Sequence, residues 1–288
     1  LIFLDPDIYV FGPLESIFNQ LNDVSILVTP HILHAQTPFN GNYQDHLFLL
    51  NGTFNLGFLG LRNSPTSDNF LKWWHHRLLD HCFFDISKGT ATDQKWLNLL
   101  PSLFPSKEYC ITRHRGMNVA PWNFHERQII DESGVLFVKD RSDDASEKDQ
   151  LIFVHFSSYD YTQIYDGKLL HKTTQIDDYP DLQNIFEAYT DALMTSHFKA
   201  FASLKYSYGF FENNVGILSL HRRVYRRLLD EKVVYENPFA TTDGTYFDLL
   251  KRKRLLDYSS FSADKLSNKT VKNFGNKFMF VNLVFIFI

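Results

Sequence analysis

The chain begins LIFLDPDIYVFGPL (residues 1–14), an apolar run that ends in Asp5 and Asp7, with Pro6 between them. Four consecutive apolar residues are typical of a buried parallel strand, and proline, which cannot donate to a ladder, marks the end of that strand. Residues i and i+2 of a strand point to the same face, so both carboxylates are expected to project from the carboxyl end, where open α/β sheets place their ligands. Such paired oxygens suit Mg²⁺ or Mn²⁺. Taken alone, the D-x-D pattern also fits a solvated turn.

The amino-acid composition indicates which partners the protein can bind and in which cellular compartment it is expected. With 288 residues, 44% of them hydrophobic, the chain can bury one large domain or one and a half. A formal net charge of -4 provides no basic field to attract nucleic acid, so no nucleic-acid partner is expected. Cys82 and Cys110 lie too far apart in sequence to form a metal or disulfide framework and fit a reducing compartment, so we expect a cytoplasmic protein.

Strand-like and helix-like segments alternate over the first part of the chain. Short apolar runs bounded by turn residues predict strands at 24–29, 53–61, 135–138 and 151–156. Apolar residues at helical spacing predict helices over 67–81 and 92–100. This alternation favours an α/β fold with layered sheet and helices.

After about residue 160 the sequence becomes aromatic and rich in helix-like segments. This change predicts that the chain has three parts. Residues 1–160 form the α/β domain, residues 161–265 a helix-rich extension or subdomain, and residues 266–288 a hydrophobic tail. The tail ends in FMFVNLVFIFI (278–288), about half the length that spans a bilayer, and leaves membrane association open.

The chemistry-bearing residues are carboxylates, amides and aromatic rings. No G-x-G-x-x-G, Walker-type loop, G-x-S-x-G or H-E-x-x-H motif occurs. Three polar stretches stand out instead: LNGTFNLGFLGLRNS (50–64), GTATDQKWLNLLPSLF (89–104) and GMNVAPWNFHER (116–127). They contribute Asn55, Asp93, Gln94, Trp122, Asn123 and His125. Amides and carboxylates suit sugar hydroxyls, and an indole suits the face of a sugar ring.

Taken in order, these motifs resemble bacterial glycosyltransferases of the GT-A fold. The motifs are LDPD, FNLGFLGLR, FLKWWHHRL, DQKWLNLLPSLF, GMNVAPWNFHER and FVHFSSYD, and the resemblance covers roughly residues 1–160. It implies a Rossmann-like mixed sheet flanked by helices, a nucleotide-sugar donor and a carbohydrate or glycan acceptor. It also implies a Mn²⁺ or Mg²⁺ ion on Asp5, Asp7 and His155, the last from VHFSSYD. Relatives commonly have glycine where this chain has Ser158.

The polar stretches supply the expected catalytic and substrate-binding residues. Asp93 and Gln94 are the expected catalytic residues, with Asp93 in contact with the acceptor or the donor sugar. The late metal-binding histidine favours retention of the anomeric configuration, because a catalytic base is then not required. Asn55, Trp122, Asn123 and His125 would bind substrate. In that family the D-x-D strand follows the nucleotide-binding half of the domain, so we expect the strands of that half to be missing here and this fragment to be inactive alone.

Two alternatives remain open. Phosphatases of the haloacid dehalogenase type also begin with an apolar strand that ends in D-x-D and binds Mg²⁺. The second alternative is that the chain is a non-catalytic remnant of a transferase and serves as a binding module. The metal hypothesis makes a geometric prediction: residues 151–156 lie beside residues 1–4, His155 faces Asp7, and the polar stretches line one cleft with them.

Overall fold

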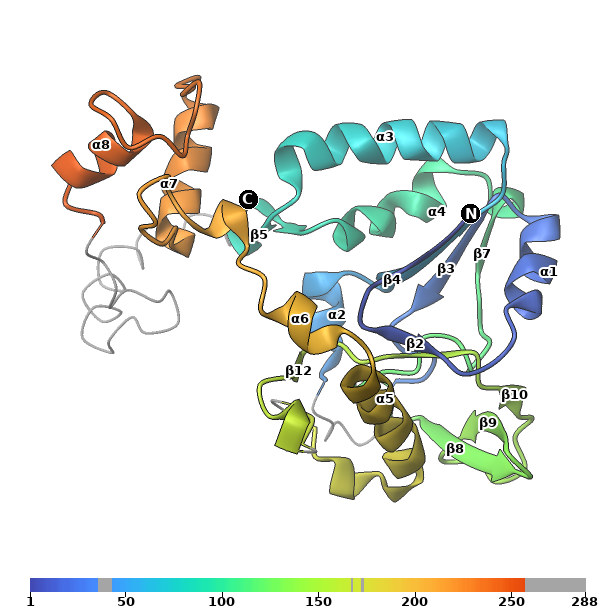
Figure 1. The fold of residues 1–288 in the computed structure, drawn as a ribbon. Helices are drawn as coiled ribbons and strands as arrows, with labels where there is room; N and C mark the ends of the chain where they lie inside the picture. The colour runs from blue at the N-terminus through green and yellow to red at the C-terminus, as the bar shows by residue number, and fades with distance from the viewer. Residues whose placement is uncertain (36–42, 167, 172–173, 257–288) are drawn as a thin grey trace, which may run out of the picture. The chain divides into compact units, whose positions relative to one another are not determined.

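The computed structural model describes residues 1–35, 43–166, 168–171 and 174–256 (Figure 1). The fold is mixed α/β, as predicted, and the chain divides into two compact units, Leu1–Phe198 and Lys199–Ile288. Residues 161–198 therefore belong to the first unit, whereas the sequence placed the boundary at residue 160.

A four-stranded sheet organises the first unit, in the order β1-β4-β3-β7. Its strands are β1 (Ile2–Leu4), β4 (Phe54–Leu61), β3 (Ile26–Pro30) and β7 (Tyr109–Ile111). β3 pairs antiparallel with β4 and parallel with β7, so the sheet is mixed. The expectation of a buried parallel strand at the start of the chain is wrong. Among the described residues β1 pairs only with β4, in antiparallel register, and this edge position leaves Phe3 47% exposed.

Helices cover both faces of the sheet (Figure 1). On one face, α3 (Pro65–His81) and α4 (Leu100–Leu103) contribute Phe70 and Leu100 to a core with Ile26 and Val28 of β3. α1 (Glu15–Asp23) contributes Ile17 and Leu21 to a core on the other face, where Leu27 of β3 points. Ile26 and Val28 thus point into one core and Leu27 into the other, as expected for a strand that is buried on both faces.

The register of β4 shifts at the point that matters for the site. Val28 of β3 pairs with Leu59, yet the next residue, Thr29, pairs with Asn55, so the intervening residues of β4 form an irregularity. Such bulges bend a strand and re-aim its side chains, often next to functional sites. Here the irregularity contains Gly57.

A third core joins residues 161–198 to the first unit. β2 (Ile8–Val10) pairs antiparallel with β11 (Phe153–His155), which places Phe156 against α5 (Gln183–Thr195). The rings of Phe156 and Tyr189 stack with centroids 3.7 Å apart. This packing explains why the first unit extends beyond residue 160.

The remaining elements of the first unit are short. A three-stranded antiparallel sheet contains β8 (Arg127–Glu132), β9 (Val135–Asp140) and β10 (Asp149–Gln150). The other short elements are α2 (Asp45–Asn51), β5 (Phe84–Asp85), β6 (Thr90–Ala91), β12 (Tyr159–Asp160), β13 (Leu170–His171) and 3-10 turns at Ile86–Lys88, Gln94–Leu99, Ser106–Glu108, Ile164–Asp166, Ile176–Asp178 and Pro180–Leu182. Residues 94–99 thus form a 3-10 turn where the sequence predicted the start of a helix.

The second unit has its own small core. α7 (Ser219–Asp230) and α8 (Tyr246–Arg252) surround the buried side chains of Phe211, Tyr246 and Leu250. α6 (Phe198–Ala202) and a 3-10 turn at Ser207–Gly209 precede them. Within the described part of the chain, every helix falls short of the length and apolar character needed to cross a bilayer. The predicted tail, residues 266–288, lies outside the described residues.

Candidate metal and substrate site

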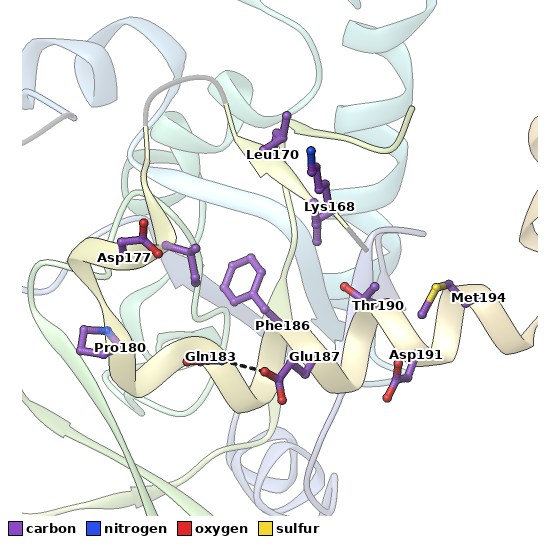
Figure 2. Close-up of a pocket in the computed structure, with 12 residues that line it drawn as sticks. Lys168, Leu170, Asp177, Pro180, Gln183, Phe186, Glu187, Thr190, Asp191 and Met194 are labelled. Atoms are coloured by element: carbon purple, nitrogen blue, oxygen red, sulfur yellow. Dashed lines mark hydrogen bonds between the residues drawn. The ribbon is translucent and has the colours of Figure 1, made fainter. Parts of the chain in front are cut away.

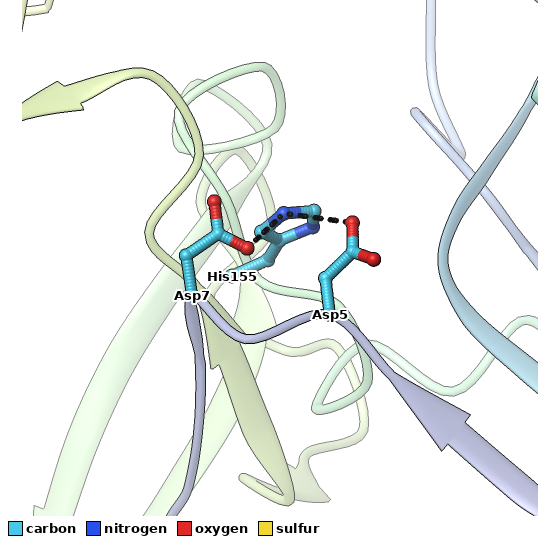
Figure 3. Close-up of side chains that lie close together, drawn as sticks. All are labelled: Asp5, Asp7 and His155. Atoms are coloured by element: carbon cyan, nitrogen blue, oxygen red, sulfur yellow. Dashed lines mark ion pairs between the residues drawn. The ribbon is translucent and has the colours of Figure 1, made fainter. Parts of the chain in front are cut away.

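Asp5, Asp7 and His155 converge as the sequence predicted (Figure 3). One ligand atom from each side chain lies within 4.8 Å of the others. Nε2 of His155 is 3.1 Å from Oδ1 of Asp7 and 3.9 Å from Oδ2 of Asp5. Two carboxylates and one imidazole at this spacing fit a hard divalent cation such as Mn²⁺ or Mg²⁺.

Backbone hydrogen bonds on both sides fix the two aspartates. The amide of Asp5 donates to the carbonyl of Gly57 on β4 (2.8 Å), which carries the edge of the sheet one residue past β1. The carbonyl of Asp7 accepts from the amide of Phe156 (2.8 Å), which continues the pairing of β2 with β11. The D-P-D turn is therefore held between two different strand pairs, and His155 lies opposite it.

The environment shifts the pKa of the two carboxyls in opposite directions. Burial raises the pKa of Asp5, His155 opposes this rise, and the like charges of Asp7 and Asp93 add to it. Burial would also raise the pKa of Asp7, but the hydrogen bond and the charge of His155 outweigh it, so that this pKa is lowered. The carboxylates of Asp5, Asp7 and Asp93 therefore repel one another, and a bound cation would reduce this repulsion.

Behind the edge of His155 that faces the two aspartates lies a buried amide pair. Nδ1 of His155 is 3.1 Å from Oδ1 of Asn55 and 3.3 Å from Oδ1 of Asn118. Both asparagines are buried, as is the imidazole. Asn118 also donates to Oγ1 of Thr29 (2.8 Å), so the network reaches β3.

A cavity of about 380 Å³ opens beside Asp5, Asp7 and His155. Its described lining residues are Asp5, Asp7, His31, Tyr43, Leu47, Phe48, Asn51, Asn55, Thr92, Asp93, Gln94, Trp122, His155, Ser157 and Ser158. The volume is within the range of small-molecule sites. None of these described lining residues is lysine or arginine.

Four of the sequence-predicted substrate and catalytic residues line this cavity: Asn55, Asp93, Gln94 and Trp122. The indole of Trp74 donates to the carbonyl of Asp93 (3.1 Å) and so holds the turn that carries the carboxylate. Gln94 donates to the carbonyl of Asn51 (3.1 Å). Trp122 presents its ring edge-on to His155, with centroids 5.2 Å apart.

Asn123 and His125, which the sequence predicted to bind substrate, are not among the described residues that line the cavity. Asn123 is fully buried; it donates to the carbonyls of His31 and Asn118 and accepts from the amide of Ala120. Its amide therefore shapes the 116–127 loop. His125 is partly buried, and burial lowers its pKa.

The sequence reasoning missed His31 and Asn118. His31 follows β3 directly, and its buried ring lies between Phe48 and Trp122. Its Nδ1 is 3.2 Å from the carbonyl of Thr53, and burial lowers its pKa to about 4. A polar residue just after a buried strand was the available signal.

Three non-glycine residues with a left-handed backbone lie around the site. Thr92, Asn118 and Ser158 have positive φ values of 49°, 57° and 65°. Thr92 and Ser158 line the cavity, and Asn118 contacts His155. For a β-branched residue such as Thr92 this conformation is unusual and is typical of functional sites.

A larger cavity, about 730 Å³, lies along α5 (Figure 2). Phe186 points into it, and Glu187 accepts a hydrogen bond from Gln183 (2.8 Å) at its rim. Among the described residues, however, the group formed by Asp5, Asp7 and His155 is the only one with three or more side chains placed to hold a metal. The smaller cavity is therefore the better candidate for chemistry.

Comparison with known proteins yields two relatives from Bacillus subtilis (strain 168). The chain is 28% identical to "Uncharacterized protein YfnF" over 191 residues, which cover 66% of this chain and 58% of that protein. It is 25% identical to "Uncharacterized protein YfnD" over 158 residues, 54% of this chain and 45% of that protein. The chain thus spans about half the length of these relatives. No family model matches it, and neither does any solved structure.

Proposed function

We propose that the chain is part of a metal-dependent glycosyltransferase of GT-A type that takes a sugar from a nucleotide-sugar donor to a carbohydrate acceptor. The observation that carries the proposal is the convergence of Asp5, Asp7 and His155 at a cavity of about 380 Å³. The ordered motifs that resemble such enzymes support it.

The charges of the cavity fit a diphosphate only when a cation is present. Asp5, Asp7 and Asp93 are acidic, and the described lining residues include no lysine or arginine that could compensate a phosphate. Two carboxylates and His155 would hold Mn²⁺ or Mg²⁺. When bound, the ion would neutralise the charge that develops on the departing nucleoside diphosphate.

Other residues of the same cavity offer groups for a sugar. Trp122 and Phe48 flank His31 and supply aromatic surface, while Asp93 and Gln94 supply a carboxylate and an amide for hydroxyl groups. In this proposal Asp93 contacts the sugar that is transferred or the acceptor, and Gln94 orients it. Mn²⁺ or Mg²⁺ is the cofactor, and the reaction retains the anomeric configuration.

A titration of nucleoside diphosphates in the presence of Mn²⁺ tests the proposal. We expect one or more diphosphates to bind the chain with Mn²⁺ and none to bind in chelator. Asp7→Asn should remove this binding, whereas Asp143→Asn, an exposed aspartate of the first unit, should leave it unchanged. Release of inorganic phosphate from phosphate esters, without turnover of nucleotide sugars, would favour a phosphatase instead.

A further inference from the structure

The hydrogen-bond pattern behind His155 specifies which ring nitrogen carries the proton, and the backbone amide of Gly57 anchors this pattern. The N–H of Gly57 can only donate, and it points at Oδ1 of Asn55 at 3.1 Å. The oxygen of the Asn55 amide must therefore lie on this side. The orientation of Asn55 is fixed by the main chain.

Asn55 in turn fixes Asn118. Nδ2 of Asn118 lies 3.0 Å from Oδ1 of Asn55, so a rotated Asn118 would bring two acceptor oxygens together. The same Nδ2 donates to Oγ1 of Thr29 at 2.8 Å, and this hydroxyl donates to the carbonyl of Asn55 at 3.3 Å. Both side-chain oxygens that face His155 are consequently acceptors.

We propose that Asn55 and Asn118 are positioning residues that hold His155 as its Nδ1–H tautomer and leave the Nε2 lone pair directed at the space between Asp5 and Asp7. Nδ1 has two acceptors within 3.3 Å, so it donates. In neutral imidazole the other nitrogen then carries no proton.

The consequence is that only the protonated ring of His155 can donate to Asp7, whereas the neutral ring leaves an electron-rich site without a donor. Nε2 of His155 and Oδ1 of Asp7 are 3.1 Å apart, and both bring lone pairs to that space when the imidazole is neutral. A cation between them turns this repulsion into coordination. Hydrogen-bond acceptors that orient a ligating histidine through its other ring nitrogen are common at metal sites.

This inference rests on the proposed metal site, and it changes the role of Asn55. The sequence assigned Asn55 to substrate, but its Oδ1 is occupied by the amide of Gly57, by Asn118 and by His155. Only its Nδ2 is left to face Gln94 and His31, each at 3.5 Å. Asn55 therefore acts on the reaction through His155.

Nitrogen-15 NMR of labelled histidine in the metal-free protein, at a pH at which the imidazole is neutral, reads the tautomer directly. The His155 signal is assigned by its loss in His155→Gln. In the wild type we expect a protonated Nδ1. Asn55→Leu and Asn118→Leu keep the side-chain size without an acceptor, and they should shift His155 towards the Nε2–H form and weaken Mn²⁺ binding about 10- to 100-fold.

Two further variants keep the test decisive. Asn55→Asp retains an acceptor oxygen at the same place, so it should keep the Nδ1–H tautomer even if the leucine variants fail to fold. Asn51→Leu, on the same cavity but not a hydrogen-bond partner of His155 among the described residues, should change neither tautomer nor Mn²⁺ affinity.

The possible results separate this inference from the proposed function. An Nε2–H tautomer in the wild type, or an unchanged tautomer in both leucine variants, overturns the role of the asparagines. A wild type with Nδ1–H that binds no Mn²⁺ supports that role and contradicts the proposed metal-dependent function.

Discussion

Gly57 and His155 are in such close contact that a β-carbon on Gly57 would lie 2.4 Å from Cε1 of the imidazole and 2.5 Å from Nδ1. The two residues come from β4 and β11, which are not hydrogen-bonded neighbours. Absence of a side chain at Gly57 therefore allows the imidazole to lie against the irregular part of β4 and face the aspartates.

Gly57→Ala should displace His155 and abolish Mn²⁺ binding, because the ring cannot keep its place beside an added methyl group. The same overpacking should lower the free energy of unfolding by about 1 to 3 kcal/mol. Calorimetric titration with Mn²⁺ and denaturant unfolding measure the two effects. Gly60→Ala, on the same strand, meets its nearest atom at 3.1 Å and is the matched control. Intact Mn²⁺ binding by Gly57→Ala would contradict the assignment of His155.

Ser158→Gly should stabilise the protein. Ser158 has a φ of 65°, a left-handed conformation that costs a residue with a β-carbon about 1 to 2 kcal/mol. Glycine removes that cost but adds entropy to the unfolded chain, which leaves a net gain of up to about 1 kcal/mol. Ser157→Gly, at a neighbouring position outside the left-handed region, should be destabilising. Equal losses in both variants, measured by thermal unfolding, would disprove this account.

Acid should destabilise the first unit through His31. Burial lowers the pKa of His31 to about 4 from its usual 6.5, so the unfolded chain binds a proton that the folded chain does not. Stability due to the neutral ring is therefore complete above about pH 6.5 and is lost as the pH falls toward 4. The loss is on the order of 3 kcal/mol. In urea unfolding at several pH values, His31→Gln should show a shallower dependence over this range, and an identical dependence would refute the prediction.

Tyr189→Ala should destabilise the first unit by about 3 to 5 kcal/mol, as expected for a buried aromatic ring. Tyr189 stacks on Phe156 with an interplanar angle of 8° and is 4% exposed. Tyr206→Ala in the second unit removes a ring that is 66% exposed and is the control. A negligible change in the free energy of unfolding of Tyr189→Ala would instead favour a domain boundary near residue 160.

The sequence was informative where one physical effect dominates. Continuous apolar runs predicted β3 and β4 because both strands are buried on both faces. Asp5 and Asp7 do converge, but from the turn between β1 and β2 and not from one face of a strand. β1 was misjudged because an apolar run of four residues does not reveal whether a strand has one neighbour or two.

The second layer of the site could not be predicted from local pattern. Asn118 and Thr29 are 89 positions apart, and their hydrogen bond depends on the packing of a loop against β3. Amides in a polar stretch suit a sugar as well as a buried network, so Asn55 and Asn123 were assigned to substrate. Burial, which only the fold determines, separates the two roles.

Titration of the purified chain with Mn²⁺, followed by the electron paramagnetic resonance signal of the free ion, tests the central claim most directly. We expect one bound Mn²⁺ per chain in the wild type. Asp7→Asn and His155→Gln should each lose it, whereas Asp143→Asn should retain it. Undiminished binding in both Asp7→Asn and His155→Gln, or no binding by the folded wild type, would contradict the claim that Asp5, Asp7 and His155 hold one divalent cation.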